Sequence, residues 1–160
     1  MSAPSPDQIV RHLKRANEVA RASMATGHHP FGAILVAPDH ETVLLEQGNL
    51  GTVNHAEAVL ARTADELYSS DYLAGCTLYT TVEPCAMCAG TMYWANIGRL
   101  VYGMDERRLL VFTGSSQENP TMDVPCRYLF EHSQKDLPVT GPVADVEEEI
   151  AALHRDFWTR

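Results

Sequence analysis

The sequence has no long apolar run and few basic residues, and each shortage excludes a class of protein. Apolar residues make up 45% of the 160 residues, yet none of their runs approaches the roughly 18 residues of a membrane helix. Residues 1–7 lack the charged start and apolar stretch of a secretory signal, so we expect a cytoplasmic protein. Lysine and arginine number 12 against 21 aspartates and glutamates, a formal net charge of -9, whereas proteins that bind nucleic acids are usually basic. The composition therefore argues against a membrane or nucleic-acid partner.

Cysteine is also scarce, and repeats and low-complexity segments are absent. Four cysteines without a regular spacing do not indicate a disulfide framework, and we interpret Cys76, in an apolar run, and Cys126, in an expected loop, as free thiols. The composition shows no break along the chain, and this length suffices for one domain with a sizeable core. We expect a single domain over residues 1–160.

Two short motifs carry the chemistry: His55-Ala56-Glu57 and, after a spacer, Pro84-Cys85-Ala86-Met87-Cys88. One imidazole and two thiols suit a tetrahedral Zn²⁺ whose fourth position stays open for water, as a catalytic zinc requires. Glu57 can transfer protons beside such a metal without ligating it. We therefore predict Zn²⁺ as cofactor, His55, Cys85 and Cys88 as its ligands, and Glu57 as the catalytic acid and base.

The spacing within each motif also predicts local geometry. Pro84 suits the first position of a helix, which would put Cys85 and Cys88 on one helical face near the positive end of the helix dipole. Residues two apart in a regular helix diverge by about 200°, so convergence of His55 and Glu57 requires His55 to lie in an irregular first turn. A Cys-x-x-Cys alone would also fit a redox site or half of a structural zinc site, but no other cysteine or histidine has an obvious ligand spacing to these motifs.

The apolar pattern predicts alternating helices and strands. A strand before the cysteine helix and another after it indicate a right-handed crossover with parallel pairing, which would place the metal at the ends of strands. The segment 113–125 is rich in Gly, Ser, Asn and Pro and is a candidate lid. The expected elements are a helix from Ser5-Pro6 to Gly27, a hairpin over 31–46, a helix at His55, strands over 76–81, 99–103 and 139–143, and a closing helix with a capping box at Asp145 and Glu148.

Together the motifs resemble the cytidine deaminase-like superfamily, whose zinc-dependent members share His-x-Glu followed by Pro-Cys-x-x-Cys. The resemblance covers about Pro30 to Gly103. It implies an α/β fold, a three-layer α/β/α sandwich with a five-stranded mixed sheet. Proteins of this kind bind Zn²⁺ and usually form homodimers. Within the superfamily, the stretches that look most like bacterial guanine deaminases are Pro30-Phe31-Gly32-Ala33, Asn49, His55-Ala56-Glu57, Thr80-Thr81-Val82-Glu83-Pro84-Cys85-Ala86-Met87-Cys88 and Met92-Tyr93-Trp94-Ala95.

This resemblance implies zinc-dependent hydrolytic deamination of a free purine base, guanine to xanthine and ammonia. The same motifs also serve tRNA adenosine deaminases, whereas the acidic charge favours a small-molecule purine substrate. Isoguanine, cytosine, guanosine and an aminotriazine remain alternatives. A third class is a non-catalytic, zinc-stabilised binding protein, against which an intact Glu57 argues.

Four residues are expected to contact the substrate. Asn49 is expected to hydrogen-bond one edge of the base, while Phe31 and Trp94 could stack on its flat ring, and Ala56 lies next to the metal ligand. The alternatives are a turn residue for Asn49 and ordinary core packing for the two aromatic residues.

The resemblance also implies a further acid that assists proton transfer from the region after the zinc-binding half. Asp123 is the first candidate for this catalytic role and Glu118 the second. Either side chain could instead be a plain loop acid.

Overall fold

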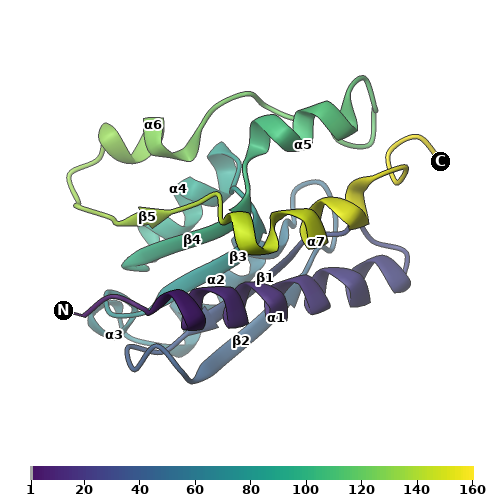
Figure 1. Ribbon diagram of the computed structural model, residues 1–160. Coiled ribbons are helices and arrows are strands. Elements are labelled where there is room, and N and C mark those ends of the chain that lie inside the picture. Colours follow the sequence, from purple (N-terminus) through teal and green to yellow (C-terminus); the bar gives the residue numbers. More distant parts are fainter. Residues whose placement is uncertain (1) are drawn as a thin grey trace.

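The structure is a computed structural model that describes residues 2–160. A five-stranded mixed sheet runs through it in the order β2-β1-β3-β4-β5 (Figure 1). The strands are β1 (Gly32–Val36), β2 (Val43–Gly48), β3 (Thr77–Val82), β4 (Arg99–Met104) and β5 (Val139–Thr140). The helices are α1 (Pro6–Ala25), α2 (Ala56–Leu67), α3 (Ser70–Leu73), α4 (Ala86–Trp94), α5 (Glu106–Thr113), α6 (Cys126–Glu131) and α7 (Ala144–His154).

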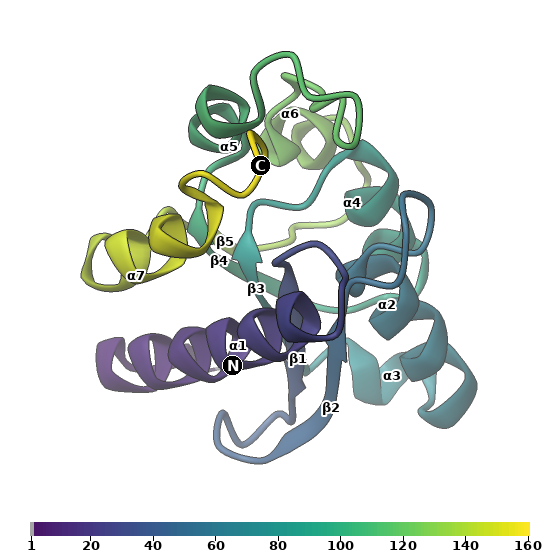
Figure 2. The same ribbon diagram turned by 90° about the vertical axis from the view of Figure 1, so that its right-hand side faces the viewer.

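Helices cover both faces of the sheet, with α1 and α7 on one side and α2, α3 and α4 on the other (Figure 2). The side chains of β1 alternate between the two layers, as the pleat of a strand requires. Ala33 and Leu35 join the apolar cluster beneath α2 and α4, whereas Ile34 and Val36 join the cluster beneath α1 and α7. The three-layer α/β/α sandwich with a five-stranded mixed sheet is confirmed.

The strand directions bring the motif-bearing loops to one edge of the sheet. β1 pairs antiparallel with β2 and β3, as expected for the hairpin, and β3 pairs parallel with β4 across α4, as the crossover predicted. The carboxyl ends of β2, β3 and β4 and the amino end of β1 therefore meet at the same edge. The segments leading into α2, α4 and α5 all start there.

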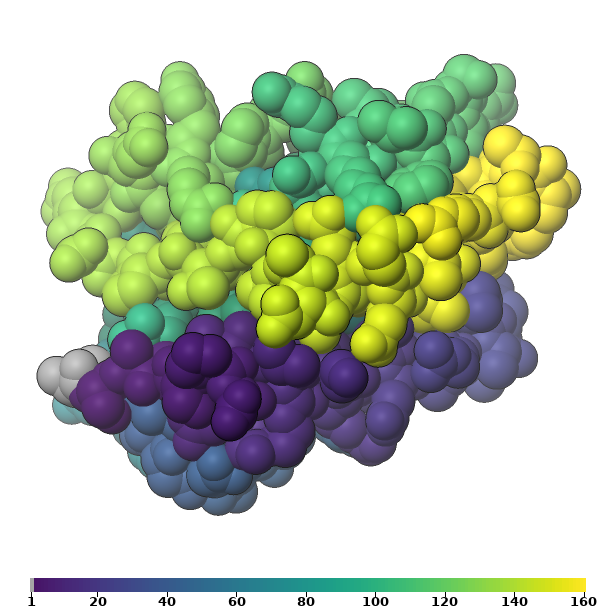
Figure 3. Space-filling view, viewed as in Figure 1, coloured from purple at the N-terminus to yellow at the C-terminus, as the bar shows by residue number. Residues whose placement is uncertain are grey.

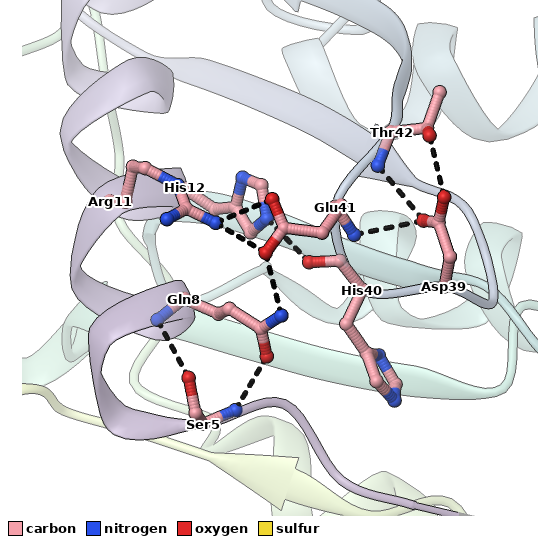
Figure 4. A network of polar contacts seen from close by, with 8 residues as sticks. All are labelled: Ser5, Gln8, Arg11, His12, Asp39, His40, Glu41 and Thr42. Atoms are coloured by element: carbon pink, nitrogen blue, oxygen red, sulfur yellow. Dashed lines mark hydrogen bonds and ion pairs between the residues drawn. The ribbon is translucent and has the colours of Figure 1, made fainter.

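Helix α1 begins and ends where the sequence predicted. At its start, the Ser5 hydroxyl accepts a hydrogen bond from the Gln8 backbone N–H, and the Gln8 side chain accepts one from the Ser5 backbone N–H. After its end, Gly27 has a φ of 89°. Its amino-terminal half is tied to the turn between β1 and β2, because Gln8 and Arg11 both donate to the carboxylate of Glu41 (Figure 4). Among residues 2–160, no helix is both long and apolar enough to cross a membrane.

Close backbone contact lets α1 and α7 lie side by side over the sheet (Figure 3). A Cβ on Gly32 would stand 2.3 Å from the Ala16 carbonyl oxygen, so only glycine lets the backbone of α1 pack this closely on β1. The amide of Asn17 on α1 donates to the carbonyl of Glu149 on α7 at 3.3 Å. The two helices thus form one continuous layer.

The predicted capping box of the last helix is wrong. α7 begins at Ala144 after Val143, which has no side-chain cap, so Asp145 already lies inside the helix. Glu148 instead accepts hydrogen bonds from Arg108 on α5 and from Arg155. The Glu148 side chain, which the local pattern assigned to the helix start, forms an ion pair with another helix instead. The last strand is also shorter than the predicted 139–143.

Cys126 does not lie in a loop, as the sequence suggested, but begins α6 and is buried. Its backbone N–H donates to Glu83 Oε2 at 2.7 Å, across 43 positions of sequence. A carboxylate that accepts a helix-terminal N–H stabilises the start of that helix. Because the acid that does so comes from the end of β3, no local pattern could predict α6.

Candidate metal centre and substrate cavity

The predicted metal ligands lie at the first residues of two helices. His55 is the N-cap of α2 with φ -63° and ψ 153°, which confirms that it lies in the irregular start of its helix. Cys85 is the N-cap of α4 with φ -67° and ψ 175°, and Cys88 follows in the first turn. The sequence predicted Pro84 at the first position of the helix, but Pro84 precedes the N-cap of α4. The extended backbone at both caps turns His55 and Cys85 toward each other.

The three ligand atoms are spaced as a tetrahedral zinc site requires. His55 Nδ1 lies 3.5 Å from each sulfur, and the Cys85 and Cys88 sulfurs are 3.7 Å apart. Zn–S bonds of about 2.3 Å and Zn–N bonds of about 2.1 Å at tetrahedral angles give separations of about 3.6 Å and 3.8 Å. Among residues 2–160, they form the one group of three or more His, Cys, Asp or Glu side chains whose ligand atoms all lie within 4.8 Å of one another. The donor set therefore fits zinc without rearrangement.

The electrostatics of the centre favour a thiolate. The hydrogen bond that the Cys85 and Cys88 sulfurs share, and then His55, lower the pKa of Cys85 to about 4 although burial opposes the change, whereas the same bond raises the pKa of Cys88. Zinc binds cysteine as the thiolate, so a low thiol pKa assists metal binding.

Glu57 lies in the first turn of α2, beside the ligands, and is only 6% exposed. Burial, and then the negative charge of Cys85, raise the pKa of Glu57 to about 7. A carboxyl with a pKa near 7 can both accept and release a proton at neutral pH. Glu57 therefore has the environment of a proton-transfer group.

A cavity of about 260 Å³ opens onto the metal centre. Its walls include His55, Glu57 and Cys85, together with Phe31 from the start of β1 and residues 118–122 from the loop before α6. The candidate lid therefore borders the site, as predicted. Parts of the chain far apart in sequence combine to form one small, partly acidic cavity.

Of the four predicted substrate contacts, Phe31 alone is part of the cavity wall. Trp94 is 82% exposed at the last residue of α4, about 12 Å along the helix from its start, and does not line this cavity, so its stacking role stays a prediction. Asn49 is buried, and its amide donates to the Gly51 carbonyl at 3.3 Å, holding the loop before α2. Ala56 is buried in the apolar cluster beneath α2.

The two candidate acids lie in different places. Asp123 lies outside the cavity and accepts a hydrogen bond from Arg107 at 3.1 Å, so its role as the further catalytic acid stays a prediction. Glu118 is part of the cavity wall, 3.4 Å from the His29 ring and 3.3 Å from the Arg160 guanidinium. Of the two acids, only Glu118 borders the cavity that contains Glu57.

Comparison with known proteins agrees with this site. Residues 6–104 match the model of the cytidine and deoxycytidylate deaminase zinc-binding region. The chain belongs to the cytidine and deoxycytidylate deaminase family. This deaminase is 31% identical over 160 residues to a probable cytosine deaminase of Schizosaccharomyces pombe, covering 95% of the chain and 93% of that protein. It is 32% identical over 136 residues to the tRNA-specific adenosine deaminase of Haemophilus influenzae, covering 78% of each.

The fold of the deaminase is also that of a solved relative. The guanine deaminase from Nitrosomonas europaea superposes with a TM-score of 0.77 at 22% identity, covering 100% of this chain and 88% of that one. The predicted superfamily is confirmed, and zinc is the metal of the matched region.

The carboxyl terminus of the deaminase packs behind the cavity wall. The Trp158 ring lies 4.7 Å from that of His29 and 5.9 Å from that of Phe31, centroid to centroid. Arg160 then reaches Glu118 on the opposite loop. The last residues of the chain thus support the rim of the site.

Sequence reasoning missed two acids in the cavity wall. Glu83, at the end of β3, accepts the backbone N–H of Glu106 at 3.0 Å as well as that of Cys126. Glu106 is 4% exposed and begins α5. An acid in the first turn of a helix is normally a surface partner of the helix dipole, so no sequence signal distinguished Glu106.

Proposed function

We propose that this deaminase hydrolyses the exocyclic amino group of a free nucleobase, with guanine, converted to xanthine and ammonia, as the first candidate. The observation that carries the proposal is the combination, in one small cavity, of a zinc-compatible ligand group and a buried carboxyl with a raised pKa. Hydrolytic deamination needs those two components.

The residues of the chain divide the work of the reaction. His55, Cys85 and Cys88 would hold Zn²⁺, which supplies the Lewis acidity that lowers the pKa of water toward about 7. Glu57 accepts a proton from the water that attacks the ring carbon bearing the amino group. It passes this proton to the adjacent ring nitrogen, and then moves the proton of the added hydroxyl group to the leaving amine, so that ammonia departs and a carbonyl remains. Glu118 can relay protons at the mouth of the cavity, and Phe31 offers a ring for stacking.

The size and charge of the cavity support a free base over RNA. Its volume of about 260 Å³ lies below the roughly 300–1,000 Å³ of pockets for drug-sized ligands. Glu57, Glu106 and Glu118 are in its wall, and the whole chain carries a formal net charge of -9, which disfavours a polyanion. Guanine is favoured by the motifs around Phe31 and Cys85 and by the similarity to a guanine deaminase over the whole chain.

Cytosine is the second candidate. The specific observation in its favour is the probable cytosine deaminase of Schizosaccharomyces pombe, which matches almost the full length of this chain. Both bases carry an amino group on a ring carbon next to a ring nitrogen and an N–H beside a carbonyl, so the chemistry described above applies to either.

We also propose that the deaminase forms a homodimer through the surface between α2 and α4. Trp94, 82% exposed, and Met87, 37% exposed, border a groove between these helices. Large exposed aromatic and Met side chains are enriched in protein interfaces and uncommon on isolated monomers. A second copy of the chain would bury them.

The test is ammonia release by the zinc-loaded protein from guanine, cytosine, adenine, their nucleosides and an anticodon stem-loop RNA. We expect turnover of a free base, and a loss of about 10²- to 10⁴-fold in kcat for Glu57→Ala, because that carboxyl makes both proton transfers. The control Glu131→Ala removes an exposed carboxylate on α6 and should retain wild-type turnover. Inosine formed only in the RNA would overturn the free-base assignment, and near-normal turnover by Glu57→Ala with zinc bound would overturn the mechanism.

A further inference from the structure

Two acids in the cavity wall take no part in the mechanism, Glu83 and Glu106. Glu83 accepts the backbone N–H groups that begin α5 and α6, whereas Glu106, the first residue of α5, is 4% exposed and lies in the wall with Glu57 and Cys85. A role for Glu106 in substrate binding deepens the proposed function and rests on it.

The position of Glu106 is set by the start of its helix. Asp105 caps α5 by accepting the Arg108 backbone N–H at 2.7 Å, and the Glu106 N–H donates to Glu83 at 3.0 Å. With its backbone held in this way, Glu106 is fixed in the cavity wall, whereas the next residue, Arg107, is exposed.

The neighbouring arginines do not neutralise Glu106. Arg107 donates to Asp123, and Arg108 pairs with Glu147 on α7. Glu106 Oε2 is buried and has no hydrogen-bond partner among residues 2–160. Burying a polar atom without a partner costs stability, so such an atom in a cavity wall points to a partner that arrives with a ligand.

The environment of Glu106 also favours its uncharged form. Burial, then the negative charges of Cys85 and Glu83, raise the pKa of Glu106 to about 9. An uncharged carboxyl offers one O–H donor and one carbonyl acceptor side by side.

That pair of groups has a direct complement in the proposed substrates. Guanine presents an N–H beside a carbonyl, an edge that the deamination does not alter, and adenine lacks it. We propose that the Glu106 carboxyl hydrogen-bonds this N–H and C=O edge, orienting the base in the cavity and selecting oxo-bases over adenine. Glu106 is then the specificity-determining residue of the site.

The experiment compares Glu106→Gln, which keeps a donor and an acceptor, with Glu106→Met, which keeps the volume and removes both. For zinc-loaded protein we expect the KM for guanine to stay within about threefold of wild type in Glu106→Gln and to rise about 10- to 100-fold in Glu106→Met. Zinc content should be unchanged in both, and the melting temperature of Glu106→Met should be equal or higher, because a buried, unpartnered acid has been removed. Glu131→Gln, at an exposed carboxylate on α6, is the matched control and should retain the wild-type KM.

A wild-type KM in Glu106→Met, or an equal rise in KM in both variants, would overturn the proposal. A lower melting temperature of Glu106→Met together with loss of zinc would indicate a structural role and would also overturn it. If wild-type protein deaminates none of the bases, the proposed function fails separately. Calorimetry with guanine and xanthine then measures the affinity of wild type, Glu106→Gln and Glu106→Met. Weaker binding by Glu106→Met alone supports the role of Glu106, and equal affinities of all three proteins overturn it.

Discussion

At the scale of single residues, Cys88 decides whether the metal centre can form. It is buried in the first turn of α4, with its sulfur 3.5 Å from His55 and 3.7 Å from Cys85. Cys88→Ser should lower zinc affinity by more than the roughly 10- to 100-fold typical of losing an outer hydrogen-bond partner, because a hydroxyl is a poor ligand for zinc. Metal content after dialysis against a graded chelator measures this loss. Cys76→Ser, at a buried free cysteine outside the centre, is the control; equal zinc retention by both variants would contradict the ligand assignment.

At the scale of elements, the docking of α7 should depend on pH through His154. Burial, and then the charge of His29, lower the pKa of His154 to about 4, and its ring accepts the Trp158 N–H at 3.2 Å. Between pH 6.5 and 4 the unfolded chain binds a proton at this position that the native protein does not, so stability rises with pH and is lost as the pH falls through this window. From pH 7 to pH 5 the loss attributable to His154 is about 2 kcal/mol.

Urea denaturation of wild type and His154→Gln at pH 7, 6 and 5 measures this contribution. The variant can still accept the Trp158 hydrogen bond but cannot titrate in this range, so its stability should fall less on acidification. His132→Gln, at an exposed histidine on the surface beyond α6, should follow the wild type. Parallel pH dependences for wild type and His154→Gln would show that α7 does not sense acid through this residue.

At the scale of the whole molecule, the exposed Trp94 should decide the oligomeric state. Trp94→Glu places a charge in the proposed interface between α2 and α4, and charged residues are depleted from the cores of protein interfaces. We expect the variant to sediment as a monomer at concentrations where the wild type is a dimer. Val111→Glu, at a 78% exposed position on α5, should remain dimeric. A wild-type monomer, or an unaffected Trp94→Glu dimer, would contradict the proposed interface.

The sequence by itself determined the chemistry of the metal centre and most of the elements. His55, Glu57, Cys85 and Cys88 are recognisable because donor type and spacing are local properties, and a helix start can be anticipated from one turn of residues. The cap at Ser5 and the parallel pairing of β3 with β4, which α4 connects, could be predicted from local patterns for the same reason.

Only the tertiary structure decided which other side chains share the site. Trp94 lies outside the cavity because α4 carries it away, and Asp123 lies at the surface, where Arg107 donates to it. Glu106 lies in the cavity wall because Glu83, from another strand, holds the start of α5. The placement of Glu106 and of the loop that contains Asp123 depends on contacts between separate segments of the chain, whose burial and charge balance no local pattern encodes.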